Sequence, residues 1–139
     1  MRRRFASASV ARIATTGANG RPHLVPVCFV LVGQTLYFAV DSKPKWPTDL
    51  KRLRNIAANP SVSILVDHYE DDWAKLWWVR FDGDAHVVTD PAEAQKAIRL
   101  LASRYSQYRA SAPAGPVIAV AMAGMSGWSA SSPLNTSSG

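Results

Sequence analysis

Apolar and polar residues alternate along much of the chain, with the period of a strand that has one buried face. Together with β-branched and aromatic runs between turn residues, this alternation predicts six strands. They are expected at about residues 9–16, 23–32, 35–40, 61–66, 76–88 and 116–122. Turns at residues 17–20 and at Gly33-Gln34 would join the first three strands into a meander. Pro26 cannot donate to a ladder, so it marks an edge or a bulge in the second strand.

A first helix is expected over about residues 48–58, after a loop that contains Pro44 and Pro47. Thr48 or Asp49 could cap this helix.

A second helix is expected to begin after Asp90, because a cap residue is followed there by Pro91 and then by Glu93. It would end near Arg104. Residues 1–129 are thus expected to form one domain, a small, mostly-β antiparallel barrel with two short helices. Residues 2–4 are expected to form a disordered tip and residues 130–139 a flexible, serine-rich tail.

The fifth strand has two unlike faces. One face is expected to join the core and carries Trp77, Val79, Phe81, Ala85 and Val87. The other carries Leu76, Trp78, Arg80, Asp82, Asp84 and His86. A tryptophan beside an arginine and carboxylates is typical of an interface or a ligand wall, and the pattern leaves both roles open for Trp78.

Composition narrows the class of protein. The 139 residues are 47% hydrophobic and 19% charged, which excludes a disordered chain. No apolar run approaches the roughly 20 residues that cross a bilayer, so we expect no membrane association. The single cysteine, Cys28, cannot form an internal disulfide, and a reducing cytoplasm is the expected location.

The net charge of +6 is unevenly distributed. Five cations crowd one short segment, opposed there only by Asp49: Lys43, Lys45, Lys51, Arg52 and Arg54. A cluster of this length matches a phosphate site better than a nucleic-acid groove, which would interleave basic and aromatic residues over several strands. We therefore expect a small anionic partner and no nucleic acid.

The sequence lacks the usual catalytic signals. It contains neither a P-loop nor a dinucleotide-binding glycine fingerprint, and His23, His68 and His86 stand alone, without metal-ligand spacing. No metal is therefore expected. An enzyme with so little reactive equipment would leave the chemistry to a cofactor.

Four segments, taken in order, resemble one known family. They are residues 12–15, 20–29, 50–66 and 71–83. The family is the flavin- and deazaflavin-binding split β-barrel superfamily named after pyridoxamine 5′-phosphate oxidase. Within it, the chain is most similar to the actinobacterial branch that uses the deazaflavin coenzyme F420, over about residues 9–129.

The resemblance implies a homodimer of six-stranded split β-barrels with two equivalent cofactor sites at the dimer interface. By that resemblance, the cofactor ring would be lined by His23, Val25, Pro26 and Val27. The phosphate and tail would contact Lys45, Lys51, Arg52 and Arg54, with Thr48 and Asn55. Trp78 and Arg80 sit where the partner subunit of the family closes over the ring. The chain departs from the family pattern at Trp46-Pro47 and at residues 121–125.

The implied activity is F420-dependent hydride transfer to or from a small organic substrate, which the sequence does not identify. Arg80 could polarise a substrate carbonyl or meet the anionic tail of the cofactor. Two alternatives remain open at this point. One is an FMN-binding oxidase or reductase of the same fold, and the other is a non-catalytic flavin- or deazaflavin-binding protein.

Overall fold

The computed structural model describes residues 1–40, 47–113, 115–131 and 136–138. The strands are β1 (Ala11–Thr16), β2 (Pro22–Val27), β3 (Val30–Val32), β4 (Thr35–Ala39), β5 (Ser61–His68), β6 (Trp77–Val87), β7 (Val117–Ser129) and β8 (Thr136–Ser138). The helices are α1 (Arg2–Ser7), α2 (Pro47–Ala58), the short 3-10 turn η1 (Trp73–Lys75), α3 (Pro91–Arg104) and α4 (Ser106–Ala110).

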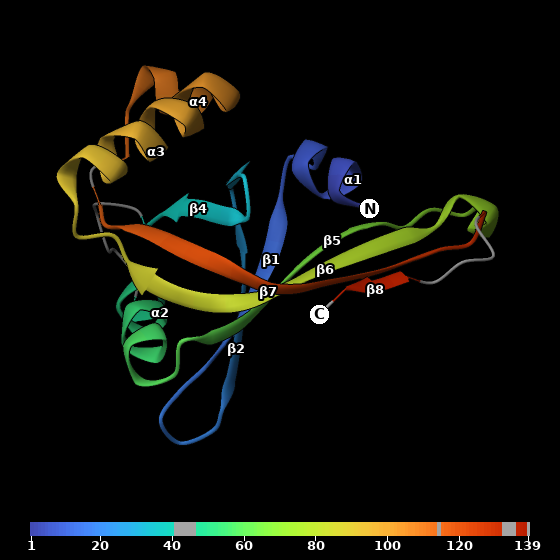
Figure 1. The fold of residues 1–139 in the computed structure, drawn as a ribbon, viewed down its shortest axis with the longest axis horizontal. Coiled ribbons are helices and arrows are strands. Elements are labelled where there is room, and N and C mark those ends of the chain that lie inside the picture. The colour runs from blue at the N-terminus through green and yellow to red at the C-terminus, as the bar shows by residue number, and fades with distance from the viewer. Residues whose placement is uncertain (41–46, 114, 132–135, 139) are drawn as a thin grey trace.

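The described strands form one antiparallel sheet in the order β2-β1-β5-β6-β7-β4-β3, with β8 paired to β7. The sheet curls, so that β3 and β4 lie on one side of the crossing long strands while β2 descends on the other (Figure 1). The mostly-β, antiparallel prediction is confirmed. The predicted count of six strands is wrong, because eight are present among the described residues.

The expected meander is also wrong. The apolar run at residues 23–32 breaks at Cys28-Phe29 into two strands that belong to different parts of the sheet. Among the described strands, β2 pairs with β1 alone and lies at an edge of the sheet, a position where proline is tolerated. β3 instead forms a hairpin with β4 through a turn in which Gly33 adopts a φ of 61°.

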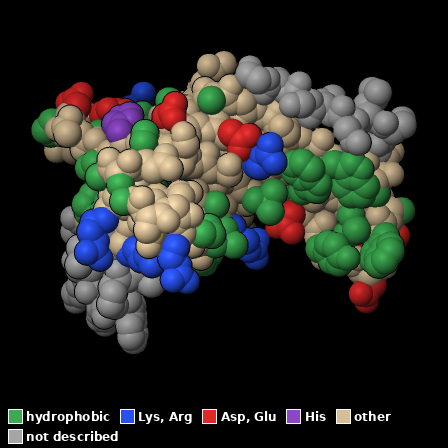
Figure 2. All heavy atoms as spheres, turned by 90° about the horizontal axis from the view of Figure 1, so that it is seen from below, with side chains coloured by type: hydrophobic (Ala, Val, Ile, Leu, Met, Phe, Trp, Pro, Cys, Tyr) green, Lys and Arg blue, Asp and Glu red, His purple; other side chains and the backbone are tan. Residues whose placement is uncertain are grey.

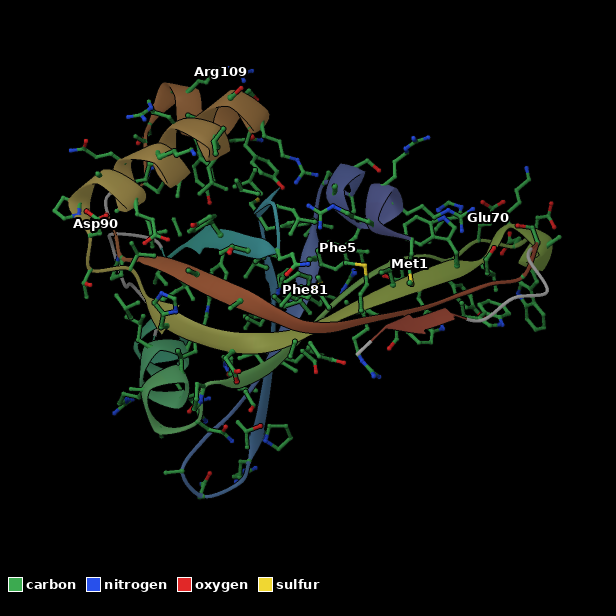
Figure 3. The ribbon with its side chains drawn as sticks, in the orientation of Figure 1. Met1, Phe5, Glu70, Phe81, Asp90 and Arg109 are labelled. Atoms are coloured by element: carbon green, nitrogen blue, oxygen red, sulfur yellow. The ribbon has the colours of Figure 1, made fainter. Side chains whose placement is uncertain are left out.

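The core fills the curl of the sheet. Its largest fully buried side chains include Phe5, Ile13, Phe29, Phe38 and Phe81. Residues 2–4, expected to form a disordered tip, belong to helix α1. Phe5 follows them in the same helix, and its ring lies 5.2 Å from Phe29 and 5.6 Å from Phe81 (Figure 3). That prediction is therefore wrong, because burial of one phenyl ring anchors the N-terminal turn against the sheet.

The predicted alternation of buried and exposed side chains holds along β6 except at its end. Val79, Phe81 and Ala85 are buried as predicted, and Trp77 packs against the core from a half-buried position. Val87, predicted to be core, is 41% exposed.

Helix boundaries agree closely with the sequence prediction. Asp90 caps α3 by accepting a hydrogen bond from the Ala92 amide, and Pro91 takes the first position. α2 begins at Pro47, so Thr48 and Asp49 lie inside the helix and not at its cap. Within residues 130–139, the expected flexible tail, Thr136–Ser138 pair with β7 as strand β8. No helix of the described residues is long and apolar enough to span a bilayer.

Candidate functional site: a cationic pocket and an apolar groove

Strand β2 carries the residues predicted to line a cofactor ring, and its two faces differ. His23 and Val25 are half-buried and Val27 is buried, whereas Leu24 and Pro26 are exposed. Leu24 leaves 65% of its surface in solvent. The inward face of this edge strand therefore packs toward the core, where Val27 is buried and Val25 lies against it, and the outward face is open to solvent.

Helix α2 supplies the cations. Lys51 and Arg54 are exposed, whereas Arg52 is half-buried with its guanidinium carbon 5.8 Å from the centre of the Phe38 ring. An arginine over an aromatic face is held in one orientation more firmly than one that extends into water. Of the remaining predicted tail contacts, Lys45 lies outside the described residues, and Thr48 lies in the first turn of α2, where the backbone alone is described.

Asn55, predicted to contact the tail, is buried instead. Its Nδ2 donates to the Thr15 hydroxyl at 3.2 Å, and only 5% of the residue is exposed. This bond ties α2 to β1 and leaves Asn55 no surface to offer a ligand in this arrangement. Its role is to hold the helix that carries Lys51 and Arg52.

His23 lies close to these cations. Burial lowers the pKa of His23, and the positive charges of Lys51 and Arg52 lower it further. The imidazole is therefore neutral at pH 7, and the local charge comes from the two α2 side chains.

A cavity of about 430 Å³, which we call the strand–helix pocket, lies where β2, β4, α2 and the segment after α3 meet. Its lining combines Pro26, Val27, Cys28, Ala39 and Arg52 with Gln107, Tyr108, Ser111, Ala112 and Pro113. Three predicted cofactor residues therefore meet at one pocket. The contribution of α4 and the following loop was not predicted, because residues 105–112 carry neither a cap motif nor an apolar period that sets them apart.

Two residues at the end of α3 fix the wall of this pocket. Arg104 donates to the Phe29 carbonyl at 2.6 Å and also to the Ala8 carbonyl, with its guanidinium carbon 4.7 Å from the Phe29 ring centre. The Tyr105 hydroxyl accepts from the Phe29 amide at 3.1 Å. These contacts pin the Cys28-Phe29 break between β2 and β3, beside the pocket. Burial there raises the pKa of the Cys28 thiol, so the thiol is protonated at pH 7.

The opposite face of the sheet carries a second hollow, which we call the outer-face groove. Its volume is about 1020 Å³. Its apolar lining includes Leu24, Leu65, Leu76, Trp77, Trp78 and Trp128. Figure 2 shows hydrophobic side chains gathered over the end of the molecule where β5, β6 and β7 extend, with Lys and Arg side chains over the opposite end. An apolar hollow of this size on a small chain marks a binding or interaction surface.

Both arginines of the groove, Arg12 and Arg80, are paired with carboxylates. Arg80 Nε lies 3.0 Å from Asp82, which also accepts from the Ser63 hydroxyl at 2.7 Å. Arg12 lies 3.2 Å from Asp67 on the neighbouring strand. From the sequence, Arg80 could contact a substrate or an anionic cofactor tail. In this arrangement its charge is balanced by Asp82 on its own strand.

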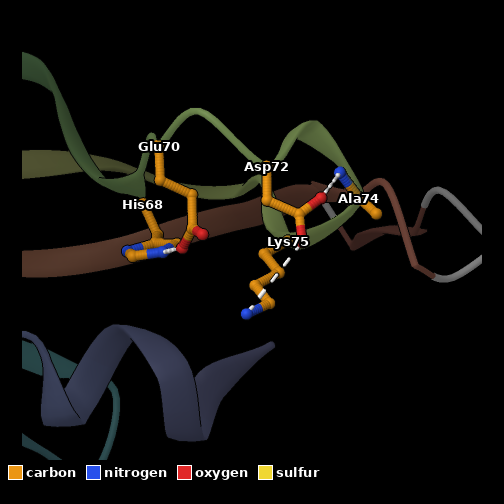
Figure 4. Close-up of polar contacts among 5 residues, drawn as sticks. All are labelled: His68, Glu70, Asp72, Ala74 and Lys75. Carbon is orange, nitrogen blue, oxygen red and sulfur yellow. Dashed lines mark hydrogen bonds and ion pairs between the residues drawn. The ribbon is translucent and has the colours of Figure 1, made fainter.

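The β5–β6 hairpin closes one end of the groove. His68 pairs with Glu70, and Asp72 caps η1 through the Ala74 amide while lying 4.0 Å from Lys75 (Figure 4). His68 also stacks on Trp77 at 6.3 Å between ring centres. These contacts give the tip a defined shape, although each is solvent-exposed and worth little free energy alone.

Comparison with known proteins assigns the fold. The family model described as pyridoxamine 5′-phosphate oxidase matches residues 1–129. This chain belongs to the pyridoxamine 5′-phosphate oxidase family. The sequence resemblance is thus confirmed at the level of the family, whereas the match does not distinguish the F420 branch. No curated protein matches the chain.

Solved structures of the same fold carry several different descriptions. A conserved hypothetical protein of Mycobacterium tuberculosis has a TM-score of 0.75 at 18% identity, covering 92% of this chain and 81% of its own. An FAD-binding protein of Mesorhizobium loti has a TM-score of 0.68 at 20% sequence identity, and the match covers 91% of this chain and 87% of that protein. The haem storage protein HutZ of Vibrio cholerae has a TM-score of 0.68 at 20% sequence identity, and the match covers 86% of this chain and 85% of HutZ. At these identities the likeness establishes a shared split β-barrel fold and leaves the ligand to the site itself.

Proposed function

We propose that this family member is an F420-dependent oxidoreductase acting on a small organic substrate. The observation that carries the proposal is the strand–helix pocket, which Arg52 lines together with Pro26 and Val27. When bound, a deazaflavin supplies the hydride acceptor or donor, so the protein needs no dedicated nucleophile or metal.

The residues around the pocket fit an anionic, partly aromatic ligand. Arg52 offers a guanidinium whose orientation is fixed by the Phe38 ring, and Lys51 and Arg54 add flexible charge at the exposed side of α2. The enclosed Nδ1 of His23 has no hydrogen-bond partner among the described residues, as expected where a polar ligand completes a site. Val25 and Val27 supply apolar surface for a flat ring.

The proposed working unit is a homodimer, in which a second copy covers the outer-face groove. The proposal is supported by the large apolar hollow and by Leu24, a leucine 65% exposed on an edge strand. In a twofold dimer the same patch would serve both copies, so Trp78 and Trp128 of one would lie against the other. The paired charges of Arg12 and Arg80 could be covered without leaving either arginine without a counter-charge.

A flavin is the second candidate cofactor, because FAD-binding proteins share this fold. The deazaflavin and the flavin differ in the tail attached to the ring system. A deazaflavin carries a longer and more anionic tail than FMN, and the run of cations at residues 43–54 favours it. Lys51 and Arg54 are exposed beyond the pocket, where an extended tail could reach them. A non-catalytic carrier would use the same contacts.

Fluorescence titration of the purified protein with F420, FMN and FAD tests the cofactor. Micromolar binding of F420 alone supports the proposal, whereas micromolar binding of a flavin alone replaces it with the second candidate. If the protein binds none of the three, both candidate cofactors are refuted. Haem, followed by its absorption spectrum, belongs in the same series because a haem storage protein shares the fold.

Substitution tests the pocket directly. Arg52→Ala should weaken binding of the preferred cofactor by about 1–3 kcal/mol, or roughly 5- to 150-fold. Arg99→Ala is the matched control, because Arg99 is an exposed arginine on α3 outside both hollows. Equal dissociation constants for the two variants would remove Arg52 from the site. Single-turnover mixing of reduced F420 with substrate panels then separates an enzyme from a carrier.

A further inference from the structure

The outer-face groove runs between two hairpin turns that lie at opposite ends of the sheet. β1 is antiparallel to both β2 and β5, so the β1–β2 turn lies near Ser61, at the start of β5, whereas the β5–β6 turn follows His68, at its end. The two turns point in different directions from the centre of the sheet (Figure 1). Leu24 on β2 and Tyr69 at the β5–β6 turn both line the groove, and both are exposed. The groove therefore extends from one turn toward the other.

The end of the groove at the β5–β6 turn is acidic. Residues 67–75 hold four carboxylates and one lysine. Asp71 and Asp72 are exposed there, and the ion pair of Asp72 with Lys75 spans 4.0 Å (Figure 4). Because the carboxylates outnumber the lysine, this end carries a net negative charge.

The end at the β1–β2 turn is basic. Three exposed cations gather there, one in the turn and two on α2: Arg21, Lys51 and Arg54. Helix α2 adjoins the turn, because a Cβ added to Gly17 would lie 3.1 Å from the side chain of Asn55. The exposed Asp84 of β6 offsets one of these charges, and the end remains positive.

Two copies of the chain can bury their grooves against each other in two senses. If the twofold axis runs along the groove, each end meets the same end of the other copy, so carboxylates face carboxylates and cations face cations. If the axis crosses the groove, the acidic end of each copy meets the basic end of the other. Apolar contact is available in both senses, and the charges favour only the second.

We infer that a second copy of this chain occupies the outer-face groove head to tail, with the acidic end of each copy against the basic end of the other. The inference rests on the dimer in the proposed function and deepens it by fixing the sense in which the two copies pack. Leu24 of each copy then lies beside Tyr69 of the other. Every contact between the two ends occurs twice in such a dimer.

Chemical cross-linking of the full chain tests the sense of packing directly. Leu24→Cys and Tyr69→Cys are prepared separately in a Cys28→Ser background, each with its own mass tag, and a short bismaleimide is added to the dimeric protein. We expect the two variants to cross-link to each other when mixed, and neither to cross-link to itself. Arg99→Cys mixed with Tyr69→Cys is the control for random collision, because Arg99 is exposed on α3 outside both hollows. Self-cross-linking of either groove variant, or no cross-link in any sample, overturns the inference.

Charge reversal provides an independent test by sedimentation equilibrium. Asp71→Lys and Arg21→Glu should each raise the dissociation constant of the dimer roughly 3- to 30-fold, and the double variant should return it toward the wild-type value. Arg99→Glu makes the same change in net charge as Arg21→Glu and should alter the constant by less than about twofold. Raising NaCl from about 50 mM to about 500 mM should weaken the wild-type dimer.

The outcomes separate the inference from the proposal on which it rests. Single reversals that strengthen the dimer would show that like ends meet, and they would overturn the head-to-tail packing alone. A double variant that dimerises no more tightly than either single variant also overturns it. A protein that stays monomeric at every concentration refutes both the dimer and its packing, while the titrations with F420, FMN and FAD still decide the cofactor.

Discussion

The Tyr105 hydroxyl is the contact whose removal has the most clearly defined consequence. It accepts from the Phe29 amide at 3.1 Å and lies 3.0 Å from the Ser9 carbonyl oxygen and 3.1 Å from that of Phe29. Phe29 is fully buried at the break between β2 and β3, where no ladder supplies its amide with a partner. The substitution Tyr105→Phe removes this hydroxyl and keeps the ring.

The expected cost can be worked out group by group. The Phe29 carbonyl still accepts from Arg104 at 2.6 Å, and the Ser9 carbonyl is near solvent and can bond to water. The Phe29 amide alone is left buried without an acceptor, which costs about 1–3 kcal/mol. We therefore expect the free energy of unfolding to fall by about 2 kcal/mol.

Urea denaturation followed by tryptophan fluorescence measures this change. With a slope of about 2 kcal/mol per molar urea, the midpoint should fall by about 1 M while the slope stays the same. Protein concentration must be equal for all samples, since a dimer would make the midpoint depend on it. Tyr69→Phe is the matched control, because Tyr69 is 73% exposed on the β5–β6 hairpin.

A midpoint for Tyr105→Phe within about 0.2 M of the Tyr69→Phe control would refute the reasoning. It would mean that the Phe29 amide finds another acceptor or water, and that the Tyr105 hydroxyl does not hold the β2–β3 break. A lower midpoint with a changed slope would show that the compactness of one state had changed, and it would contradict the assignment of the loss to a single amide.

Three further predictions concern the frame around the site. Gly83→Ala should destabilise the chain by at least about 1–3 kcal/mol in the same assay, since a Cβ there would overlap the Ala121 carbonyl oxygen, and a smaller loss contradicts that contact. Asp90→Ala should cost about 1 kcal/mol through loss of the α3 cap, whereas Asp90→Asn should cost less. The hydrogen bond to Glu93, together with burial, raises the pKa of Tyr37 to about 12, so this bond should stabilise the fold fully below about pH 10 and be lost toward pH 12. Tyr37→Phe should remove that dependence in unfolding titrations at alkaline pH.

Strand alternation and helix-capping patterns predict the structure correctly where neighbouring residues alone determine it. The alternation along β1, β5 and most of β6 follows from one buried face, and Asp90-Pro91 starts α3 as a cap followed by proline. Val87 departs from the alternation at the end of β6, where the next residue, Val88, is buried instead, in a second apolar cluster with Ala97, Val117 and Ala119. That cluster includes residues of α3 and β7, which the local pattern of β6 does not reveal.

The break in the second strand could not be predicted from local pattern. Residues 24–32 are apolar throughout, and either one buried strand or two short ones fit such a run. What divides them is the pair of groups that Phe29 meets, Arg104 and Tyr105, which lie 75 and 76 positions away. Only the packed chain brings these groups together.

The candidate site was predicted in its residue types more than in its arrangement. Arg52 and Val27 line one pocket, whereas Asn55 bonds to Thr15 and Arg80 pairs with Asp82. Polar side chains that could bind a ligand can instead form hydrogen bonds or ion pairs with one another. Which of them do so depends on strand register, and one sequence does not fix that register.

The two hollows share no lining residue, yet the predicted cofactor residues are divided between them. Strand β2 contributes to both, because Leu24 lines the groove while Pro26 and Val27 line the pocket. An edge strand can serve two surfaces in this way, since one side of its backbone has no partner in its own sheet. In the proposed dimer, a second copy seated in the groove would lie beside β2 and so beside the pocket. Mutation of Trp128 in the groove should then weaken both dimerisation and cofactor binding, whereas in a monomeric binder it would affect neither.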